Sequence, residues 1–233
     1  MIYLELGNTT IKLAHDVGDD MLLLERFTSA DALLKRIGNV DDRIVCAPIG
    51  QKHSEKLLRA LSERDDTVII SPEMLSRFIG DSYDTPHTLG IDRVLNLMGL
   101  VADGVVISCG TAITVDMLVG GIPSWGAIMP GFTTAAEGLH ERIPALPSVD
   151  IHHIPALPSR TTIDSVANGV IVGTVHAAQA IATDLSALAP KAQLTVVLTG
   201  GDAQILERLW RGEPKPVLDE LLIFAGMAKI AAG

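Results

Sequence analysis

The chain has 233 residues, of which 48% are hydrophobic and 20% are charged. This length and composition predict one large domain or two closely packed lobes with a buried core, and they exclude a disordered chain. The formal net charge of −10 offers no broad basic face, so we expect neither nucleic acid nor an anionic membrane as a partner. The two cysteines, Cys46 and Cys109, lack the spacing of a disulfide framework or a zinc site, which fits a reducing cytoplasm.

The beginning of the chain has the pattern of a strand rather than that of a basic leader. The longest apolar stretches are interrupted by glycine, proline or charged residues, which predicts that none of them reaches membrane-spanning length. From these features we expect a cytoplasmic protein without a membrane segment.

Strands and helices are predicted to alternate in the first part of the chain. Residues 2–6 and 10–14 predict two strands, joined through the Gly7-Asn8 turn signal that hairpins favour. A helix, a strand, a helix and a strand are then predicted over residues 30–38, 43–50, 54–64 and 67–71. This alternation indicates an α/β lobe.

A polar loop at residues 83–93 and a helix at 94–101 end this pattern, and we place the boundary between two lobes after residue 103. Residues 105–118 repeat the opening design of strand, small-residue turn and strand, which indicates an internal repeat. The later elements are a helix, a strand and two helices, predicted over residues 163–188, 194–201, 202–210 and 218–231. Because no low-complexity linker separates them, lobes 1–103 and 104–233 are expected to face each other across a cleft.

The turns of the two strand pairs are candidates for binding a nucleotide. Glycine, asparagine and threonine allow backbone N–H groups and hydroxyls to converge on phosphate oxygens. An acid at the end of the preceding strand would hold a hydrated cation that bridges those oxygens. Glu5 has this position in the first turn, whereas Ser108 has it in the second. Each turn alone is equally well explained as an ordinary hairpin turn, but two turns at matching places favour a nucleotide clamp.

A further glycine turn occurs in "LTGGDA", residues 198–203. It predicts a strand that passes through two glycines into a helix that begins at Asp202. Such a helix start can approach a ribose or a phosphate closely. A tight strand-to-helix turn is the simpler explanation when this segment is taken alone.

A series of motifs follows one order along essentially the whole chain. They are Glu5-Leu6-Gly7-Asn8-Thr9 with Lys12 after it, Tyr83-x-x-Pro86-x-x-Leu89-Gly90-x-Asp92-Arg93, Gly110-Thr111-Ala112-x-Thr114-x-Asp116, "GAIMPG" at 126–131, Leu146-Pro147, Arg160-x-Thr162 and "LTGGDA". In this order the motifs resemble those of type III pantothenate kinases, members of the actin/hexokinase-like acetate and sugar kinase superfamily. The motif from Tyr83 to Arg93 is the most specific match.

The resemblance implies an α/β fold of two RNase H-like lobes, a homodimer, and transfer of the γ-phosphate of ATP, bound with Mg²⁺, to the primary hydroxyl of pantothenate. That reaction gives 4'-phosphopantothenate, in the first step towards coenzyme A. The resemblance makes Asp92 the general base. It assigns pantothenate binding to Tyr83, Gly90, Ile91 and Arg93, together with Thr162 of the partner subunit. It assigns the ATP site to Glu5, Gly7, Asn8, Thr9, Lys12 and Thr111.

These assignments agree with the chemistry of the residues. Phosphoryl transfer needs an oriented hydroxyl, in-line geometry, and positive charge or N–H donors on the phosphate oxygens. An aspartate can take the proton late, and an adjacent arginine can hold a carboxylate in a two-pronged grip. Without the flanking motif, Asp92 and Arg93 would be explained by a helix N-terminal acid and a surface arginine.

Two positions depart from the family pattern, which has aspartate at both. Glu5 keeps the charge but moves its carboxylate by about 1.5 Å, the length of one C–C bond. At Ser108 the family aspartate ligates a monovalent cation, usually K⁺, whereas a serine hydroxyl is neutral, so we expect the potassium dependence to be lost. Pro144-Ala145 also replaces the family's Thr-Ala pair, which predicts a different substrate wall.

Three functions stay open at this point. The first is a working kinase that does not need the monovalent cation. The second is a relative that binds pantothenate or nucleotide and acts as a regulatory or partner-binding protein, and the third is a kinase for another small hydroxyl substrate. Retention of the base Asp92 and of the phosphate contacts Lys12 and Thr111 favours the first.

Other reactive residues have simpler explanations. His152 and His153 are adjacent in a predicted loop and lack an accompanying acid-histidine spacing, which predicts solvated side chains rather than a metal site. Cys109 is predicted to be a small buried residue at a strand end.

Overall fold

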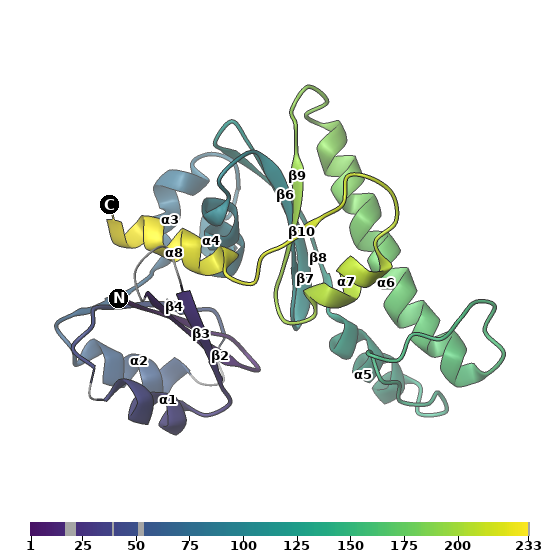
Figure 1. Cartoon of the computed structure of the whole chain (residues 1–233), viewed down its shortest axis with the longest axis horizontal. Coiled ribbons are helices and arrows are strands. Elements are labelled where there is room, and N and C mark those ends of the chain that lie inside the picture. The colour runs from purple at the N-terminus through teal and green to yellow at the C-terminus, as the bar shows by residue number, and fades with distance from the viewer. Residues whose placement is uncertain (17–21, 39, 51–53, 233) are drawn as a thin grey trace. The chain divides into compact units, whose positions relative to one another are not determined.

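The computed structural model describes residues 1–16, 22–38, 40–50 and 54–232. It divides the chain into two compact units, one of Met1–Leu100 with Leu221–Gly233 and one of Val101–Glu220. Among the described residues, each unit contains a five-stranded sheet with helices packed on it (Figure 1). The predicted α/β fold of two lobes is confirmed.

The sheet of the first unit has the strand order β3-β2-β1-β4-β5. β1, β2 and β3 are antiparallel, and β4 and β5 run parallel to β1. The strands are β1 (Ile2–Leu6), β2 (Ile11–Asp16), β3 (Leu22–Phe27), β4 (Ile44–Pro48) and β5 (Thr67–Ile69). The helices are α1 (Ala30–Ile37), α2 (Ser54–Ser62), α3 (Pro72–Ile79), the 3₁₀ helix η1 (Pro86–Thr88), α4 (Ile91–Gly99) and α8 (Leu222–Ala232).

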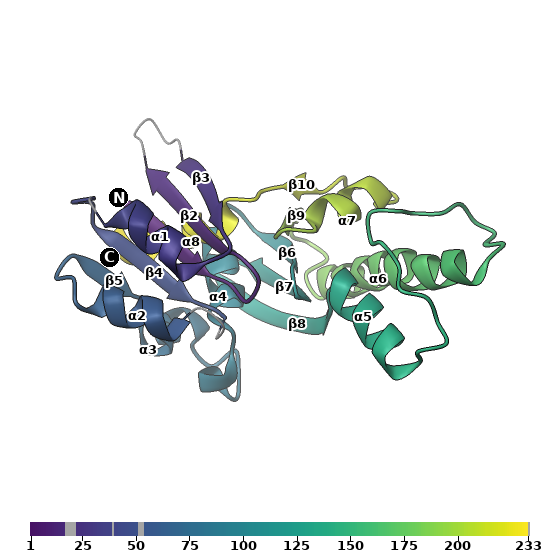
Figure 2. The ribbon, with the colours of Figure 1, turned by 90° about the horizontal axis from the view of Figure 1, so that it is seen from below.

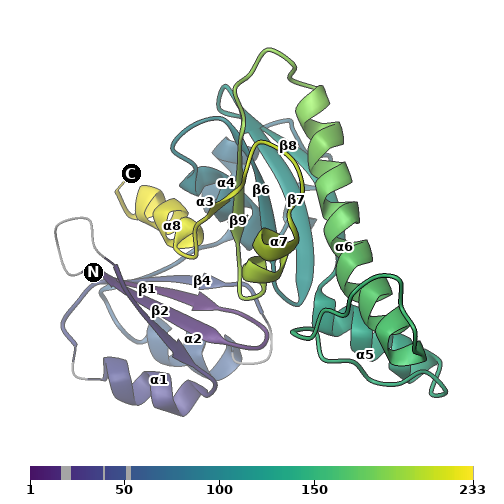
Figure 3. The same cartoon turned by 45° about the vertical axis from the view of Figure 1, so that its right-hand side comes forward.

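The two faces of the first sheet are covered by different helices (Figure 3). Ile2, Leu4 and Leu6 belong to a buried cluster with residues of α1 and α2. Because side chains alternate along a strand, Tyr3 and Glu5 point to the opposite face. On that face α8 contacts β1 and β4, and α4 contacts β4. Glu5 therefore lies on the side of the sheet that carries α4.

α4 and α8 touch backbone to backbone because both have a glycine at the contact. A Cβ added at Gly226 would lie 2.0 Å from the carbonyl oxygen of Leu95, and one added at Gly99 would lie 2.1 Å from that of Leu222. No side chain fits at either position. The two glycines thus set how closely α8 approaches α4.

The position of α8 corrects the predicted domain division. Residues 221–233 were assigned to the second lobe, whereas they belong to the first unit, and the boundary between the units falls after Leu100 rather than after residue 103. Besides the glycine contact, the ammonium of Lys229 donates a hydrogen bond of 3.0 Å to the carbonyl of Leu100, at the end of α4. A cation at that end satisfies helix carbonyls that otherwise lack a partner.

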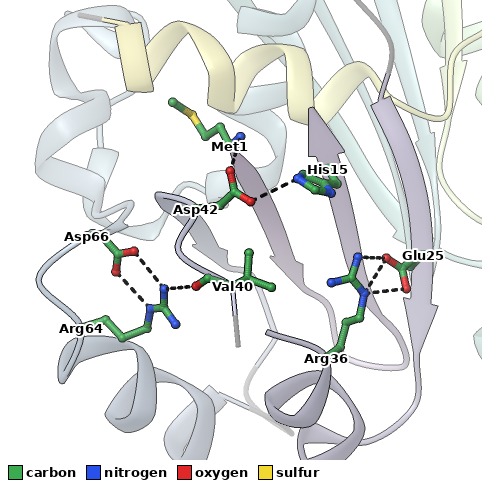
Figure 4. Close-up of polar contacts among 8 residues, drawn as sticks. All are labelled: Met1, His15, Glu25, Arg36, Val40, Asp42, Arg64 and Asp66. Carbon is green, nitrogen blue, oxygen red and sulfur yellow. Dashed lines mark hydrogen bonds and ion pairs between the residues drawn. The ribbon is translucent and has the colours of Figure 1, made fainter. Parts of the chain in front are cut away.

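Ion pairs tie the edges of the first unit together (Figure 4). Arg36 of α1 pairs with Glu25 of β3 at 2.8 Å, so the helix is anchored to the edge strand. The guanidinium of Arg64 pairs with Asp66 at 2.9 Å and also donates to the carbonyl of Val40 at 2.9 Å. A third group joins Asp42 to the amino group of Met1 and the imidazole of His15.

The sheet of the second unit has the strand order β10-β9-β6-β7-β8. β6, β7 and β8 are antiparallel, while β9 runs parallel to β6 and β10 runs parallel to β9. The strands are β6 (Gly104–Cys109), β7 (Ala112–Val119), β8 (Ile122–Pro130), β9 (Thr195–Thr199) and β10 (Val217–Leu218). Both sheets thus join an antiparallel meander to two parallel strands, so the predicted internal repeat is confirmed.

Three helices accompany the second sheet: α5 (Phe132–Arg142), α6 (Thr162–Ala187) and α7 (Ala203–Leu209). α6 packs on β6 and β7, and α5 and α7 lie beside it (Figure 2). By length and composition alone, α6 could cross a membrane, and 44% of its most apolar window is buried within the protein. The prediction that no apolar stretch reaches spanning length is therefore wrong for α6.

The predicted strands and helices up to β5 agree with the structure to within a few residues, as do those at β6, β7, α6, β9 and α7. The predicted helix at 94–101 begins three residues earlier, at Ile91, and the predicted helix at 218–231 begins only at Leu222. Six elements were not predicted: β3, α3, η1, β8, α5 and β10.

Candidate functional site

The first turn connects β1 to β2 and is enclosed by backbone. Leu6 pairs with Ile11, so residues 7–10 form the connection. A Cβ added at Gly7 would lie 2.7 Å from the carbonyl oxygen of Thr10, and one added at Gly50 would lie 2.5 Å from the amide nitrogen of Asn8. Only glycine fits at these two positions, because any side chain would collide with backbone.

Gly50 packs against the first turn, a contact that the sequence did not predict. It follows β4, and its N–H donates to the carbonyl of Leu6 at 2.6 Å, so the loop after β4 closes onto the first turn. The signal was a glycine at the end of a buried strand, in "IVCAPIG". Nothing in the one-dimensional pattern indicated that this strand pairs with β1.

Glu5 and Lys12 face each other across the hairpin next to this turn. They are register partners in the β1–β2 ladder. The ammonium of Lys12 lies 2.9 Å from one carboxylate oxygen of Glu5 and 3.2 Å from the other. Both side chains are largely buried, with 16% of Lys12 and 13% of Glu5 exposed. The structure thus brings together two of the predicted ATP-binding side chains as an ion pair.

Asp92 lies in the first turn of α4, whose N-cap residue is Gly90. The pKa of Asp92 is raised, chiefly because burial disfavours its charged form, and the negative charge of Glu5 raises it further. A hydrogen bond from the Arg93 N–H and the positive charge of Arg93 act in the opposite direction. A Cβ at Gly90 would lie 2.5 Å from a carboxylate oxygen of Asp92, so the glycine leaves room for this carboxylate.

The predicted pantothenate residues of this unit lie in one stretch of chain. Tyr83 precedes η1 and is half-buried, and Gly90, Ile91 and Arg93 stand at the start of α4. Arg93 is buried, with 4% of its surface exposed. Charged side chains are rarely buried to this extent without a structural or functional reason. The alternative explanation of a surface arginine therefore does not hold for Arg93.

The second turn, between β6 and β7, is built in a similar way. A Cβ at Gly131 would lie 1.9 Å from the carbonyl oxygen of Gly110, so the start of α5 is packed directly against this turn. The carbonyl of Thr111 accepts hydrogen bonds from the N–H of Gly131 at 3.0 Å and from the hydroxyl of Thr134 at 2.7 Å. Thr111 itself is exposed.

Ser108 lies two residues before Gly110, opposite Thr114 on β7 and Thr199 on β9. Its neighbours in the ladder are thus hydroxyl residues. The nearby "LTGGDA" segment closes onto the same strand, because Gly200 has φ +94° and the N–H of Asp202 donates to the carbonyl of Cys109 at 3.2 Å. Burial raises the pKa of Asp202, while the charge of His152 lowers it.

Thr162, the fifth predicted substrate residue, is the first residue of α6 and is exposed. It lies in the second unit, whereas Asp92 lies in the first. The N-cap of α6 is Thr161, whose hydroxyl accepts a hydrogen bond from the N–H of Asp164 at 3.1 Å. The hydroxyl of Thr162 is not used in this cap.

Cysteine and metal chemistry contribute little to the described part of the chain. Burial raises the pKa of Cys46 and of Cys109 to about 12, so both thiols are protonated at neutral pH. The prediction that Cys109 is buried is confirmed. Within the described residues, no group of three or more His, Cys, Asp or Glu side chains is arranged to hold a metal ion. His152 and His153 are exposed, as predicted.

The fold of two five-stranded sheets with the same pairing order is shared with solved structures. A glucokinase of the ROK family from Streptomyces griseus, solved with glucose and AMPPNP, shares this fold with a TM-score of 0.51, at 12% identity and with 100% of this chain and 99% of that chain covered. A conserved Baf family protein from Campylobacter jejuni matches with a TM-score of 0.62 at 23% identity, covering 100% of this chain and 98% of that chain.

The family model for type III pantothenate kinase matches residues 1–184. The chain belongs to the type III pantothenate kinase family. The type III pantothenate kinase of Kosmotoga olearia is 37% identical over 125 residues, which are 52% of this chain and 47% of that protein. The protein of the same name from Nitrosococcus oceani is 28% identical over 254 residues, which are 99% of this chain and 93% of that protein. In the matches of highest identity, the chain therefore spans about half the length of its relatives.

Proposed function

We propose that this protein transfers the γ-phosphoryl group of ATP to the primary hydroxyl of pantothenate, which yields 4'-phosphopantothenate and ADP. Membership of the type III pantothenate kinase family supports this reaction. The observation that carries the proposal is that the Glu5–Lys12 pair and α4, which carries Asp92, lie on the same side of the first sheet, where the charge of Glu5 raises the pKa of Asp92. This arrangement places a candidate base and a candidate phosphate contact on one side of the sheet.

Asp92 would act as the general base. The pantothenate hydroxyl attacks the γ-phosphorus, the bond from that phosphorus to the bridging oxygen breaks, and the carboxylate of Asp92 takes the hydroxyl proton. A base works best when its pKa is not far below the working pH, and the raised pKa of Asp92 moves it in that direction. Gly90 would keep this carboxylate accessible to the substrate.

Arg93, Tyr83 and Ile91 would hold pantothenate. Pantothenate carries a carboxylate, which a guanidinium can bind through two parallel hydrogen bonds. Burial of Arg93 strengthens such a contact because less water competes for it. Tyr83 and Ile91 are both half-buried and flank this stretch of chain.

ATP would be bound through both turns. Gly7, Asn8 and Thr9 would offer backbone N–H groups and hydroxyls to the phosphates, Lys12 an ammonium, and Thr111 a contact from the second unit. Mg²⁺ usually takes one or two protein carboxylates, with phosphate oxygens and water as its other ligands. Glu5 is the carboxylate available at the first turn, and the family use of ATP with a divalent metal fits this donor set.

Potassium is not expected to be required. The family position of the cation ligand is occupied by Ser108, whose neighbours Thr114 and Thr199 are neutral. Three hydroxyl residues supply oxygen ligands but no charge, so the attraction for a monovalent cation is weaker there than beside an aspartate.

The proposal includes a cytoplasmic homodimer in which Thr162 contributes to the pantothenate site of the partner subunit. The exposure of Thr162 in the single chain supports this role, because a hydroxyl that serves another subunit must be accessible. The exposed side chains of Ile143, Leu157 and Ile163 occur in the same region of the sequence and would be covered by a partner.

The direct test is product identification. Purified protein is incubated with pantothenate and Mg-ATP, and phosphopantothenate is measured by mass spectrometry. A mixture of the Asp92→Asn and Thr162→Val variants tests the shared site, because only mixed dimers would recover one intact site. Absence of the product with wild-type protein would contradict the proposed reaction, and absence of recovery would contradict the shared site.

Ser108 favours one alternative, a relative that binds pantothenate or nucleotide without turnover. A binding protein has no need of the activating cation that the family aspartate ligates. Calorimetric binding of pantothenate together with undetectable phosphopantothenate would support this alternative.

A further inference from the structure

In the Glu5–Lys12 pair, the ammonium of Lys12 is bound to a carboxylate before any nucleotide is present. Direct register partners in an antiparallel ladder have their Cβ atoms only about 4.5–5.5 Å apart. Both carboxylate oxygens of Glu5 lie within hydrogen-bonding distance of the Lys12 ammonium, at 2.9 and 3.2 Å. The ammonium of Lys12 is therefore paired with the carboxylate of Glu5.

The same carboxylate lies beside the first turn. One oxygen of Glu5 is 3.7 Å from the place that a Cβ at Gly7 would occupy. Only glycine fits here, because the same Cβ would lie 2.7 Å from the carbonyl oxygen of Thr10, so the carboxylate lies directly beside the peptide groups of the turn. An anion that enters the turn would therefore meet a carboxylate already bound to the lysine.

A carboxylate and a phosphate oxygen compete for one ammonium, because both are anionic acceptors that prefer the same donor geometry. The competition matters here because 16% of Lys12 and 13% of Glu5 are exposed, so water screens the pair only in part. The exposed ion pair of Lys56 with Asp31, by contrast, has side chains that are 61% and 79% exposed.

We propose that Glu5 is a positioning residue that occupies Lys12 while the first turn is empty and yields it to an anionic phosphate of the nucleotide. This inference rests on the proposed function, because it takes a nucleoside polyphosphate as the ligand of the turn. Glu5 keeps the lysine pointed at the turn and weakens the binding of nucleotide in the absence of metal. A residue that served only as a cation ligand would have no effect without metal.

A double-mutant cycle of Glu5 and Lys12 separates the role of a positioning residue from that of a cation ligand. Binding of ADP is measured by calorimetry, in EDTA and in Mg²⁺, for wild-type protein and for the Glu5→Gln, Lys12→Met and double variants. Glu25→Gln is the matched control, since it makes the same change in the same sheet and breaks the Arg36–Glu25 pair on the other face. Thermal unfolding verifies that each variant is folded.

In EDTA, we expect Glu5→Gln to tighten ADP binding by about threefold to tenfold, the size of a typical net hydrogen-bond contribution. Lys12→Met should weaken binding, and Glu5→Gln should have no effect in the Lys12→Met background. In the kinase assay, Glu5→Gln should lower both KM for ATP and kcat, since the lysine is no longer oriented. Glu25→Gln should leave all these values unchanged.

Equal effects of Glu5→Gln with and without Lys12, or an effect confined to Mg²⁺, would overturn the inference. These outcomes are distinct from failure of the proposed reaction. A wild-type protein that binds ADP with the expected coupling but makes no phosphopantothenate would support the role of Glu5 and refute the kinase activity. A wild-type protein that binds no ADP would overturn both.

Discussion

Replacement of Gly226 by alanine tests whether the contact between α8 and α4 holds the candidate base in place. The added Cβ would lie 2.0 Å from the carbonyl oxygen of Leu95 and 2.8 Å from its carbonyl carbon. Ordinary separations between such atoms are about 3.5 Å, so the helices must move apart by about 1.5 Å. Both colliding groups are backbone, so no side-chain rotation relieves the clash.

Overpacking of this kind costs about 1–3 kcal/mol, and the better helix propensity of alanine returns up to about 1 kcal/mol. We expect a net loss of about 1 kcal/mol in the free energy of unfolding, measured by urea denaturation. For a chain of this size, such a loss lowers Tm by about 2–4 °C. Since α4 carries Asp92 in its first turn, a displacement of about 1 Å should also lower kcat by about a hundredfold.

Gly173→Ala is the control for this experiment. Gly173 lies in α6, and a Cβ added there meets nothing within 4 Å. Alanine should therefore stabilise the protein by about 0.5–1 kcal/mol and leave kcat unchanged. If Gly226→Ala instead behaved like Gly173→Ala in both stability and kcat, the account of the α4–α8 contact would be wrong.

Three further predictions follow from the charges and thiols of the site. Asp92→Asn should stabilise the protein at neutral pH. The carboxyl of Asp92 has a raised pKa in the folded state, so the stability of the wild-type protein falls as the pH rises from the ordinary pKa of 3.8 through the raised pKa. Urea denaturation should therefore find Asp92→Asn more stable than wild-type protein at pH 7 and equally stable below the ordinary pKa. Cys46 and Cys109 have a pKa of about 12 and should not react with a thiol reagent at pH 8 in the folded protein. Labelling of these thiols in the folded protein as fast as in denaturant would contradict their burial. Turnover by wild-type protein should be the same in sodium and in potassium salts, whereas potassium should stimulate turnover by Ser108→Asp. Stimulation of wild-type protein by potassium would refute the role given to Ser108.

The hairpins at the two turns were predictable because their signals are local. Strand residues flank a glycine turn in each case, and α6 shows a long helical period. β8 was missed because its pattern is irregular: Pro123 and Gly126 interrupt it, and a bulge opposite Val115 and Asp116 breaks the alternation. α3, eight residues that begin at Pro72, was also missed.

The tertiary partners of each element were beyond the sequence prediction. An apolar helix face indicates that α8 is buried but not that it returns to the first unit to pack on α4. The same holds for Gly50, whose importance arises from the pairing of β4 with β1. The Glu5–Lys12 pair was not predicted, because strand patterns alone do not assign the register of the hairpin.

Pantothenate-dependent release of ADP by wild-type protein and by Asp92→Asn tests the central claim most directly. The account predicts turnover that requires pantothenate, that is lost by at least about a hundredfold in Asp92→Asn, and that persists in Glu25→Gln. Its pH profile should fall on the acid side at a pH above the ordinary pKa of an aspartate, because the pKa of Asp92 is raised. Release of ADP at the same rate with and without pantothenate, or full turnover by Asp92→Asn, would contradict the account.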